Sequence, residues 1–142
     1  MRILAVDFGE KRIGLALSDP LGITAQGLPS LHRQNNDADF KHLNDLCAQR
    51  GIGRVVVGLP LRLTGEIGYK AKEVIEWVWK LEKAVSCPVE TWDERLTSKE
   101  AERVMIQQGL SRKRRKEKSD ELAAILILQN YLDTHRVPRD LE

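Results

Sequence analysis

MRILAVDFGEKRIGLALSD, residues 1–19, decides the fold class of this chain. Its two apolar runs, residues 2–7 and 13–18, are joined by a short turn of glycine, glutamate and lysine. A connection this short joins antiparallel strands, so the stretch predicts a β-hairpin. The first run ends on a carboxylate, Asp7, and a charged group at the end of a buried strand indicates a functional site. The alternative is that Asp7 only caps the turn.

Downstream of the hairpin, the sequence alternates strands and helices. Residues 26–33 are a weaker candidate for a third strand, which Pro29 restricts to a sheet edge. Strands are predicted over residues 54–58 and 88–93, and helices over 35–51, 66–85, 97–108 and from Ser119 onward. This order predicts a single α/β domain over residues 1–142, with a mixed sheet that is antiparallel at one edge and parallel in the centre, and with helices on both faces.

The predicted helix over residues 66–85 has the clearest apolar stripe. Trp77 and Trp79 lie two residues apart on it, so their rings face different sides, and we expect one ring to pack in the core. Stacking of the other ring on a nucleic-acid base is the less favoured alternative. The stripe itself consists of Ile67, Ala71, Val74, Ile75, Val78 and Leu81.

Composition limits the class of protein. Of the 142 residues, 42% are hydrophobic and 31% are charged, which is ordinary for a globular protein in water. The chain has no apolar run long enough for a membrane span and no signal-peptide pattern at its start, so we expect a cytoplasmic protein. Cys47 and Cys87 are isolated in sequence, which predicts two reduced and mostly buried thiols.

Positive charge is concentrated in one segment. The net charge of +2 hides a segment, SRKRRKEK at residues 111–118, that carries +5 and leaves the rest of the chain at −3. A basic segment on a slightly acidic body favours a polyanionic partner, and a solvated loop is the alternative.

Carboxylates follow the predicted strands at the points where a binding site is expected. Asp7 ends the first strand, Asp93 and Glu94 end the last, and Asp120 lies in the first turn of the final helix. Functional groups of open α/β sheets gather beyond the carboxyl ends of parallel strands. Several carboxylates in one place repel each other unless a cation neutralises them, and oxygen ligands favour Mg²⁺ or Mn²⁺. Two such ions form the clamp that many phosphodiester-cleaving enzymes use, so two ions are expected here.

Structural alternatives remain open for two of these acids. Asp93 is the weaker candidate ligand, because an ion pair with Arg95 or a turn cap explains it equally well. Asp120 is favoured in a first helical turn by the helix dipole alone.

Four segments carry a family resemblance: AVDFGEKRIGLALSD, VVVGLP, TWDERLTSKEA and KSDELAAILILQNYL. In this order and spacing they resemble the YqgF/RuvX family of Holliday junction resolvase-like proteins and pre-16S rRNA nucleases. The resemblance covers essentially the whole chain. It implies a ribonuclease H-like fold with a five-stranded sheet, a metal site formed by Asp7, Glu94 and Asp120, and a role in maturing the 5′ end of pre-16S rRNA. The chain departs from the family at residues 62–65, Arg-Leu-Thr-Gly, where an Asn-Met-Asn/Asp-Gly-type segment is usual.

Basic residues near the acids fit a nucleic-acid substrate. Lys11 and Arg12 follow Asp7 closely, and we expect them to contact phosphates that flank the scissile bond; an ion pair of Arg12 with Asp7 or Asp19 is the alternative. Contacts further along the backbone are expected from Arg95, Arg112, Lys113, Arg114, Arg115 and Lys116.

These observations predict a metal-dependent endonuclease acting on structured nucleic acid. The resemblance implies that structured RNA, in ribosomal precursor particles, is the leading substrate, and a branched four-way DNA junction is the alternative. Cutting a junction symmetrically requires two sites, so a homodimer favours DNA and a monomer favours RNA. A catalytically silent nucleic-acid-binding module is a second class. An actin-like ATPase, suggested by the D-x-G-x-x-R-x-G pattern at residues 7–14, is disfavoured because 142 residues leave no room for a second domain.

Overall fold

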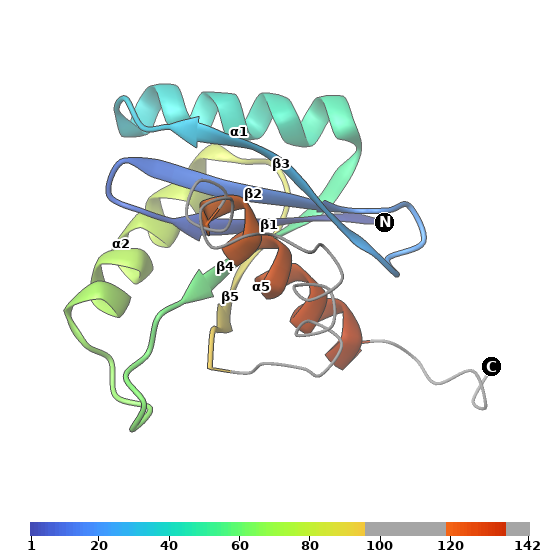
Figure 1. The fold of residues 1–142 in the computed structure, drawn as a ribbon. Coiled ribbons are helices and arrows are strands. Elements are labelled where there is room, and N and C mark those ends of the chain that lie inside the picture. Colours follow the sequence, from blue (N-terminus) through green and yellow to red (C-terminus); the bar gives the residue numbers. More distant parts are fainter. Residues whose placement is uncertain (96–118, 136–142) are drawn as a thin grey trace.

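The computed structural model describes residues 1–95 and 119–135, with the side chains of Ser119 and Asp120 outside the described part. Figure 1 shows the strands and the helices around them. The predicted helix over 97–108 and the basic segment 111–118 lie outside the described residues. The elements are β1 (Arg2–Phe8), β2 (Arg12–Ser18), β3 (Ala25–His32), α1 (Asn36–Arg50), β4 (Ile52–Leu59), α2 (Tyr69–Ala84), β5 (Val89–Asp93) and α5 (Ser119–His135).

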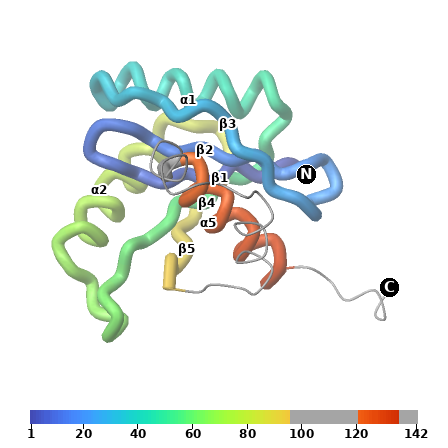
Figure 2. Tube along the Cα trace, in the orientation of Figure 1, coloured from blue at the N-terminus to red at the C-terminus, as the bar shows by residue number. Residues whose placement is uncertain are grey.

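The strands form one mixed sheet in the order β3-β2-β1-β4-β5. β1 pairs antiparallel with β2 and parallel with β4, and β4 continues the parallel half with β5. Figure 2 follows the chain from the blue hairpin of β1 and β2 to the green β4 beside it. The prediction of an antiparallel edge and a parallel centre is confirmed. Pro29 lies in β3, the edge strand, where its missing N–H group costs least.

Helices cover both faces of this sheet (Figure 1). Leu4 and Val6 of β1 belong to the core that α1 and α2 close, whereas Ile3 and Ala5 belong to the core under α5. Alternation along a strand separates the two sets. Small residues let α5 approach closely, since a Cβ atom added at Gly27 would collide with the side chain of Glu121.

Local signals place α1 as expected. The Asn35 side chain accepts a hydrogen bond from the Ala38 N–H at 2.8 Å, and Gly51 ends the helix with φ +63°. Both are favoured choices at helix ends, the first because it satisfies a free N–H and the second because glycine tolerates positive φ.

The start of α2 corrects the sequence prediction. The helix begins at Tyr69, so Ile67 lies before it and is 61% exposed, and Ile75 is only half-buried. The preceding residues close a turn instead, with the Gly65 N–H donating to the Arg62 carbonyl at 2.7 Å and Gly65 at φ +88°. As expected, one tryptophan packs in the core: Trp77 is 4% exposed and Trp79 61%.

The two cysteines are not isolated in space. Their Sγ atoms are 3.8 Å apart, and both are free thiols. Burial, followed by the neighbouring Cys87, raises the pKa of the Cys47 thiol to about 12. Within residues 1–95 and 119–135, no helix has the length and apolar character needed to cross a membrane.

Candidate active site

The carboxyl ends of three neighbouring strands bring Asp7 and Glu94 to one edge of the sheet. Val6 of β1 pairs with Val57 of β4, and Gly58, the next residue of β4, pairs with Trp92 of β5. The Glu94 N–H continues this ladder by donating to the Leu59 carbonyl at 3.2 Å. The expected convergence of residues 2–7, 54–58 and 88–93 at one end is therefore confirmed.

Gly58 lets Glu94 reach across the central strand. Asp7 and Glu94 extend from strands on either side of β4, and adjacent strands lie roughly 4.8 Å apart. A Cβ atom added at Gly58 would collide with Glu94 Oε1 and with Ile127 Cδ1 of α5, and would lie 3.1 Å from Glu94 Cδ. The carboxyl group of Glu94 thus occupies the space that a side chain on β4 would fill.

The two carboxyl groups interact directly. The pKa of Glu94 is raised to about 7, first by burial and then by the charge of Asp7, a hydrogen bond with the Asp7 side chain and the charge of Asp93. A buried carboxyl group beside a second one retains a proton until a cation compensates the negative charge. The pair is therefore a strong candidate for a cation-binding site.

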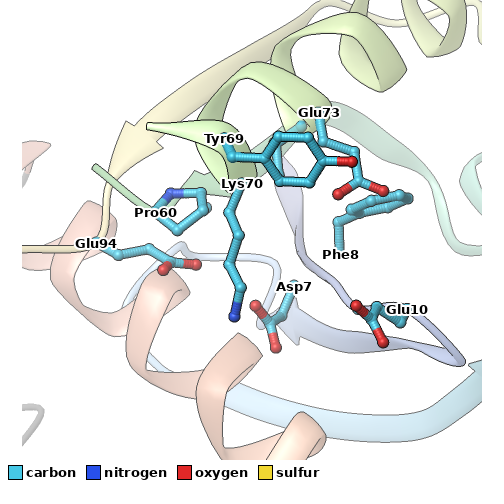
Figure 3. A pocket seen from close by; sticks show the side chains of 11 residues that line it. Asp7, Phe8, Glu10, Pro60, Tyr69, Lys70, Glu73 and Glu94 are labelled. Atoms are coloured by element: carbon cyan, nitrogen blue, oxygen red, sulfur yellow. The ribbon is translucent and has the colours of Figure 1, made fainter. Parts of the chain in front are cut away.

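A cleft of about 430 Å³ opens over these two acids. Figure 3 shows Asp7 and Glu94 on its floor and the first turns of α2 above them, with the Lys70 side chain pointing down toward the carboxyl groups. The lining residues are Asp7, Phe8, Gly9, Glu10, Gly58, Pro60, Tyr69, Lys70, Glu73, Val74 and Glu94.

Asp93 has a structural partner. Its carboxylate accepts hydrogen bonds from the Arg95 backbone N–H at 2.9 Å and from the Arg95 guanidinium at 2.7–3.1 Å. These hydrogen bonds hold the pKa of Asp93 below its usual value. Arg95 also donates to the Leu63 carbonyl at 3.3 Å, so the pair ties the loop after β4 to the end of β5. The ion pair with Arg95 expected under the structural alternative for Asp93 is present, and phosphate binding by Arg95 stays a prediction.

Of the other predicted residues, two lie at the β1–β2 turn and the rest are wholly or partly outside the described part of the chain. Lys11 and Arg12 are exposed at the β1–β2 turn and do not belong to the lining residues. Asp120 lies in the first turn of α5, which covers the sheet face that carries Ala5 and Val56, but its side chain is outside the described part. Residues 112–116 are outside it as well.

Sequence reasoning missed the helical wall of the cleft. Tyr69, Lys70 and Glu73 line it because α2 begins directly above the carboxyl end of β4. The available signal was the topology, since a helix that follows a parallel strand begins at the functional edge. Arg33 was also missed: it donates to the carbonyls of Gly9 and Glu10 at 3.1 Å and stacks on Phe8, which fixes the β1–β2 turn beside Asp7.

The donor set fits a divalent cation. Among the described side chains, no group of three histidine, cysteine, aspartate or glutamate residues is placed to hold a metal. Mg²⁺ nevertheless commonly binds through one or two carboxylates and completes its shell with water and substrate phosphates. Asp7 and Glu94 supply two hard oxygen ligands whose mutual repulsion a cation would relieve.

Comparisons with known proteins agree with this architecture. A family model described as "RuvX: Holliday junction resolvase" matches residues 1–134. A protein of Syntrophomonas wolfei named "Putative pre-16S rRNA nuclease" is 49% identical over 140 residues, covering 99% of each chain. A protein of Clostridium acetobutylicum with the same name is 44% identical, covering 94% of this chain and 99% of its own.

Solved structures support the fold. The Thermus thermophilus RuvC in complex with a Holliday junction substrate superposes with a TM-score of 0.57 at 19% identity, over 95% of this chain and 96% of that one. A fowlpox virus resolvase in complex with Holliday junction DNA superposes with a TM-score of 0.52 at 15% identity, over 94% and 98% of the two chains. At these identities the likeness establishes the ribonuclease H-like fold.

Proposed function

Since this chain belongs to the RuvX family, we propose that it is a divalent-metal-dependent endonuclease that processes the 5′ end of pre-16S rRNA in the cytoplasm. The observation that carries the proposal is the pairing of Asp7 with Glu94 on the floor of a cleft at the carboxyl edge of the sheet. RNA is favoured over DNA as substrate because full-length relatives at 41–49% identity bear the name of a pre-16S rRNA nuclease.

In this proposal, Asp7 and Glu94 hold Mg²⁺ or Mn²⁺, and Asp120 completes the site from α5. The bound cations, two of them as in the clamp of many phosphodiester-cleaving enzymes, would supply Lewis-acid stabilisation of the charge that develops on the phosphoryl oxygens. The chain's own part is to fix the two carboxyl groups. Gly58 leaves the space through which Glu94 approaches, and the ladder to Leu59 fixes its backbone. We assign contacts with the phosphate backbone beyond the cleft to Lys11, Arg12 and Arg95, and to the basic residues 112–116 of the sequence.

The test is cleavage of a pre-16S 5′-leader RNA and of a four-way DNA junction, each with Mg²⁺ or Mn²⁺. We expect Asp7→Asn, Glu94→Gln and Asp120→Asn to lower the cleavage rate by about 100-fold or more, as the loss of a group that stabilises transition-state charge typically does. Asp45→Asn is the matched control, because Asp45 is an exposed carboxylate on α1 outside the cleft lining. Cleavage that survives Asp7→Asn contradicts the proposed site.

The same assay separates the alternatives. A four-way junction that is cut faster than the RNA, by a protein that sediments as a dimer, identifies a DNA resolvase, which the family model's description favours. Binding without cleavage, unchanged by Asp7→Asn, identifies a silent nucleic-acid-binding module.

A further inference from the structure

The roof of the cleft carries two adjacent side chains whose chemistry suits a nucleotide. Tyr69 and Lys70 are the first two residues of α2, and both line the cleft opposite Asp7 and Glu94. Figure 3 shows the Tyr69 ring across the upper part of the cleft and the Lys70 ammonium group between the two carboxyl groups in that view. One wall thus offers a flat ring and a cation, and the opposite wall two carboxyl groups.

Within the described part of the chain, no aromatic contact holds the Tyr69 ring in place. The residue is 83% exposed, and its ring takes part in none of the aromatic contacts found among residues 1–95 and 119–135. By contrast, Phe8 on the same cleft packs against Trp77 and under Arg33. An exposed aromatic ring beside a nucleic-acid-cleaving site is a platform on which a base stacks.

Lys70 is not a member of the ion pairs that join described side chains at Arg54, Arg62 and Arg95. A phosphate that enters the cleft to reach Asp7 and Glu94 brings its oxygens toward this ammonium group, which is a point-charge donor suited to phosphate.

The size of the cleft limits what it takes in. A volume of about 430 Å³ lies in the range of pockets for single small molecules, roughly 300–1,000 Å³, and is suited to one nucleotide rather than a base pair with its neighbours. A base held on Tyr69 is therefore unpaired.

We propose that Tyr69 and Lys70 form a nucleotide clamp, in which Tyr69 stacks on an unpaired base and Lys70 binds the adjoining scissile phosphate. This proposal rests on the proposed nuclease function and adds a substrate class, a single-stranded or unstacked nucleotide at the cleavage site. The clamp selects strand structure rather than sequence, because every base has a face that stacks and every nucleotide has a phosphate.

The clamp is tested by binding, measured by fluorescence anisotropy of a labelled single-stranded RNA in the uncleaving Asp7→Asn background. We expect Tyr69→Ala to weaken binding about tenfold, within the 1–3 kcal/mol that stacking of one base contributes, and Tyr69→Phe to recover most of it. Trp79→Ala is the matched control, an exposed aromatic on the same helix that does not line the cleft. With a fully paired duplex of the same sequence, the Tyr69→Ala effect disappears.

Lys70 is tested through the salt dependence of RNA binding. Lys70→Gln should make the slope of the logarithm of the association constant against the logarithm of the salt concentration less steep by about 0.7, the value for one phosphate contact on a single strand. Lys70→Arg should retain the wild-type slope. Lys80→Gln, an exposed lysine elsewhere on α2, is the control. The clamp is wrong if Tyr69→Ala binds like Trp79→Ala, or if Lys70→Gln keeps the wild-type slope. The proposed function fails separately, if the otherwise wild-type protein cleaves neither RNA nor DNA with any divalent cation.

Discussion

At the scale of single residues, Gly58 decides whether the two acids meet. The glycine is needed for space, because any Cβ at this position collides with the Glu94 carboxyl group. We expect Gly58→Ala to displace Glu94 and lower metal-dependent cleavage about tenfold or more, with a stability loss of about 1–3 kcal/mol from overpacking against Ile127. The measurements are cleavage rate and urea unfolding at a temperature where both proteins remain folded.

A double-mutant cycle controls this experiment. In a Glu94→Ala background, Gly58→Ala should have little further effect on cleavage, since the side chain it displaces is already gone. If the two losses add in full, Gly58 acts on something other than Glu94.

The raised pKa of Glu94 predicts a pH dependence of stability. Its pKa rises from 4.5 to about 7 on folding, so between these values the folded state binds more protons than the unfolded state. The free energy of unfolding of the metal-free protein should therefore fall as pH rises from about 4.5 to 7, by at most about 3 kcal/mol from this group. Urea unfolding in EDTA measures it, with Glu94→Gln as reference. Equal slopes in the two proteins would falsify the coupling.

At the scale of elements, the sequence predicts strand and helix types better than their limits. Apolar and β-branched runs identify β1, β2, β4 and β5, whereas β3 is only a weaker candidate, and caps at Asn35 and Gly51 identify α1. The start of α2 is not predicted correctly, because Ile67 continues the apolar period of the helix by chance. The turn closed at Gly65 precedes the helix and leaves Ile67 outside it. The place of the Tyr69 and Lys70 side chains in the cleft is not predicted for the same reason, because it depends on where α2 begins over β4.

The buried face of α2 gives a prediction about stability. Trp77 packs against Phe8 and Phe40, with ring centroids 4.6 and 5.6 Å away, whereas Trp79 is exposed on the same helix. We expect Trp77→Ala to lower the free energy of unfolding by about 3–5 kcal/mol, and Trp79→Ala to change it by about 0.5 kcal/mol or less. Guanidinium unfolding followed by circular dichroism measures both. Similar losses in the two variants would contradict the placement of α2.

At the scale of the whole molecule, the candidate site is assembled from distant segments. Asp7 and Glu94 are far apart in sequence and meet because parallel pairing aligns β1, β4 and β5. The element pattern predicts a parallel centre of the sheet, and these acids meet at one end if the three strands are neighbours, as they are. The path of Glu94 over Gly58 depends on side-chain packing between β4 and α5, and no sequence pattern encodes it.

Charge distribution over the whole chain gives the last prediction. The segment at residues 111–118 carries +5 on a body of net charge −3, so it should supply most of the salt dependence of binding. One variant replaces with glutamine the five basic residues Arg112, Lys113, Arg114, Arg115 and Lys116. On single-stranded RNA, the slope of the logarithm of the association constant against the logarithm of the salt concentration should become less steep by up to about 3.5, because each phosphate contact contributes about 0.7. The control replaces the same number of exposed cations on α1 and α2: Lys41, Arg50, Lys72, Lys80 and Lys83. Both variants lose five positive charges, so a difference between their slopes reports the position of the charges and not their number. Equal slopes would assign the salt dependence to net charge instead of to this segment.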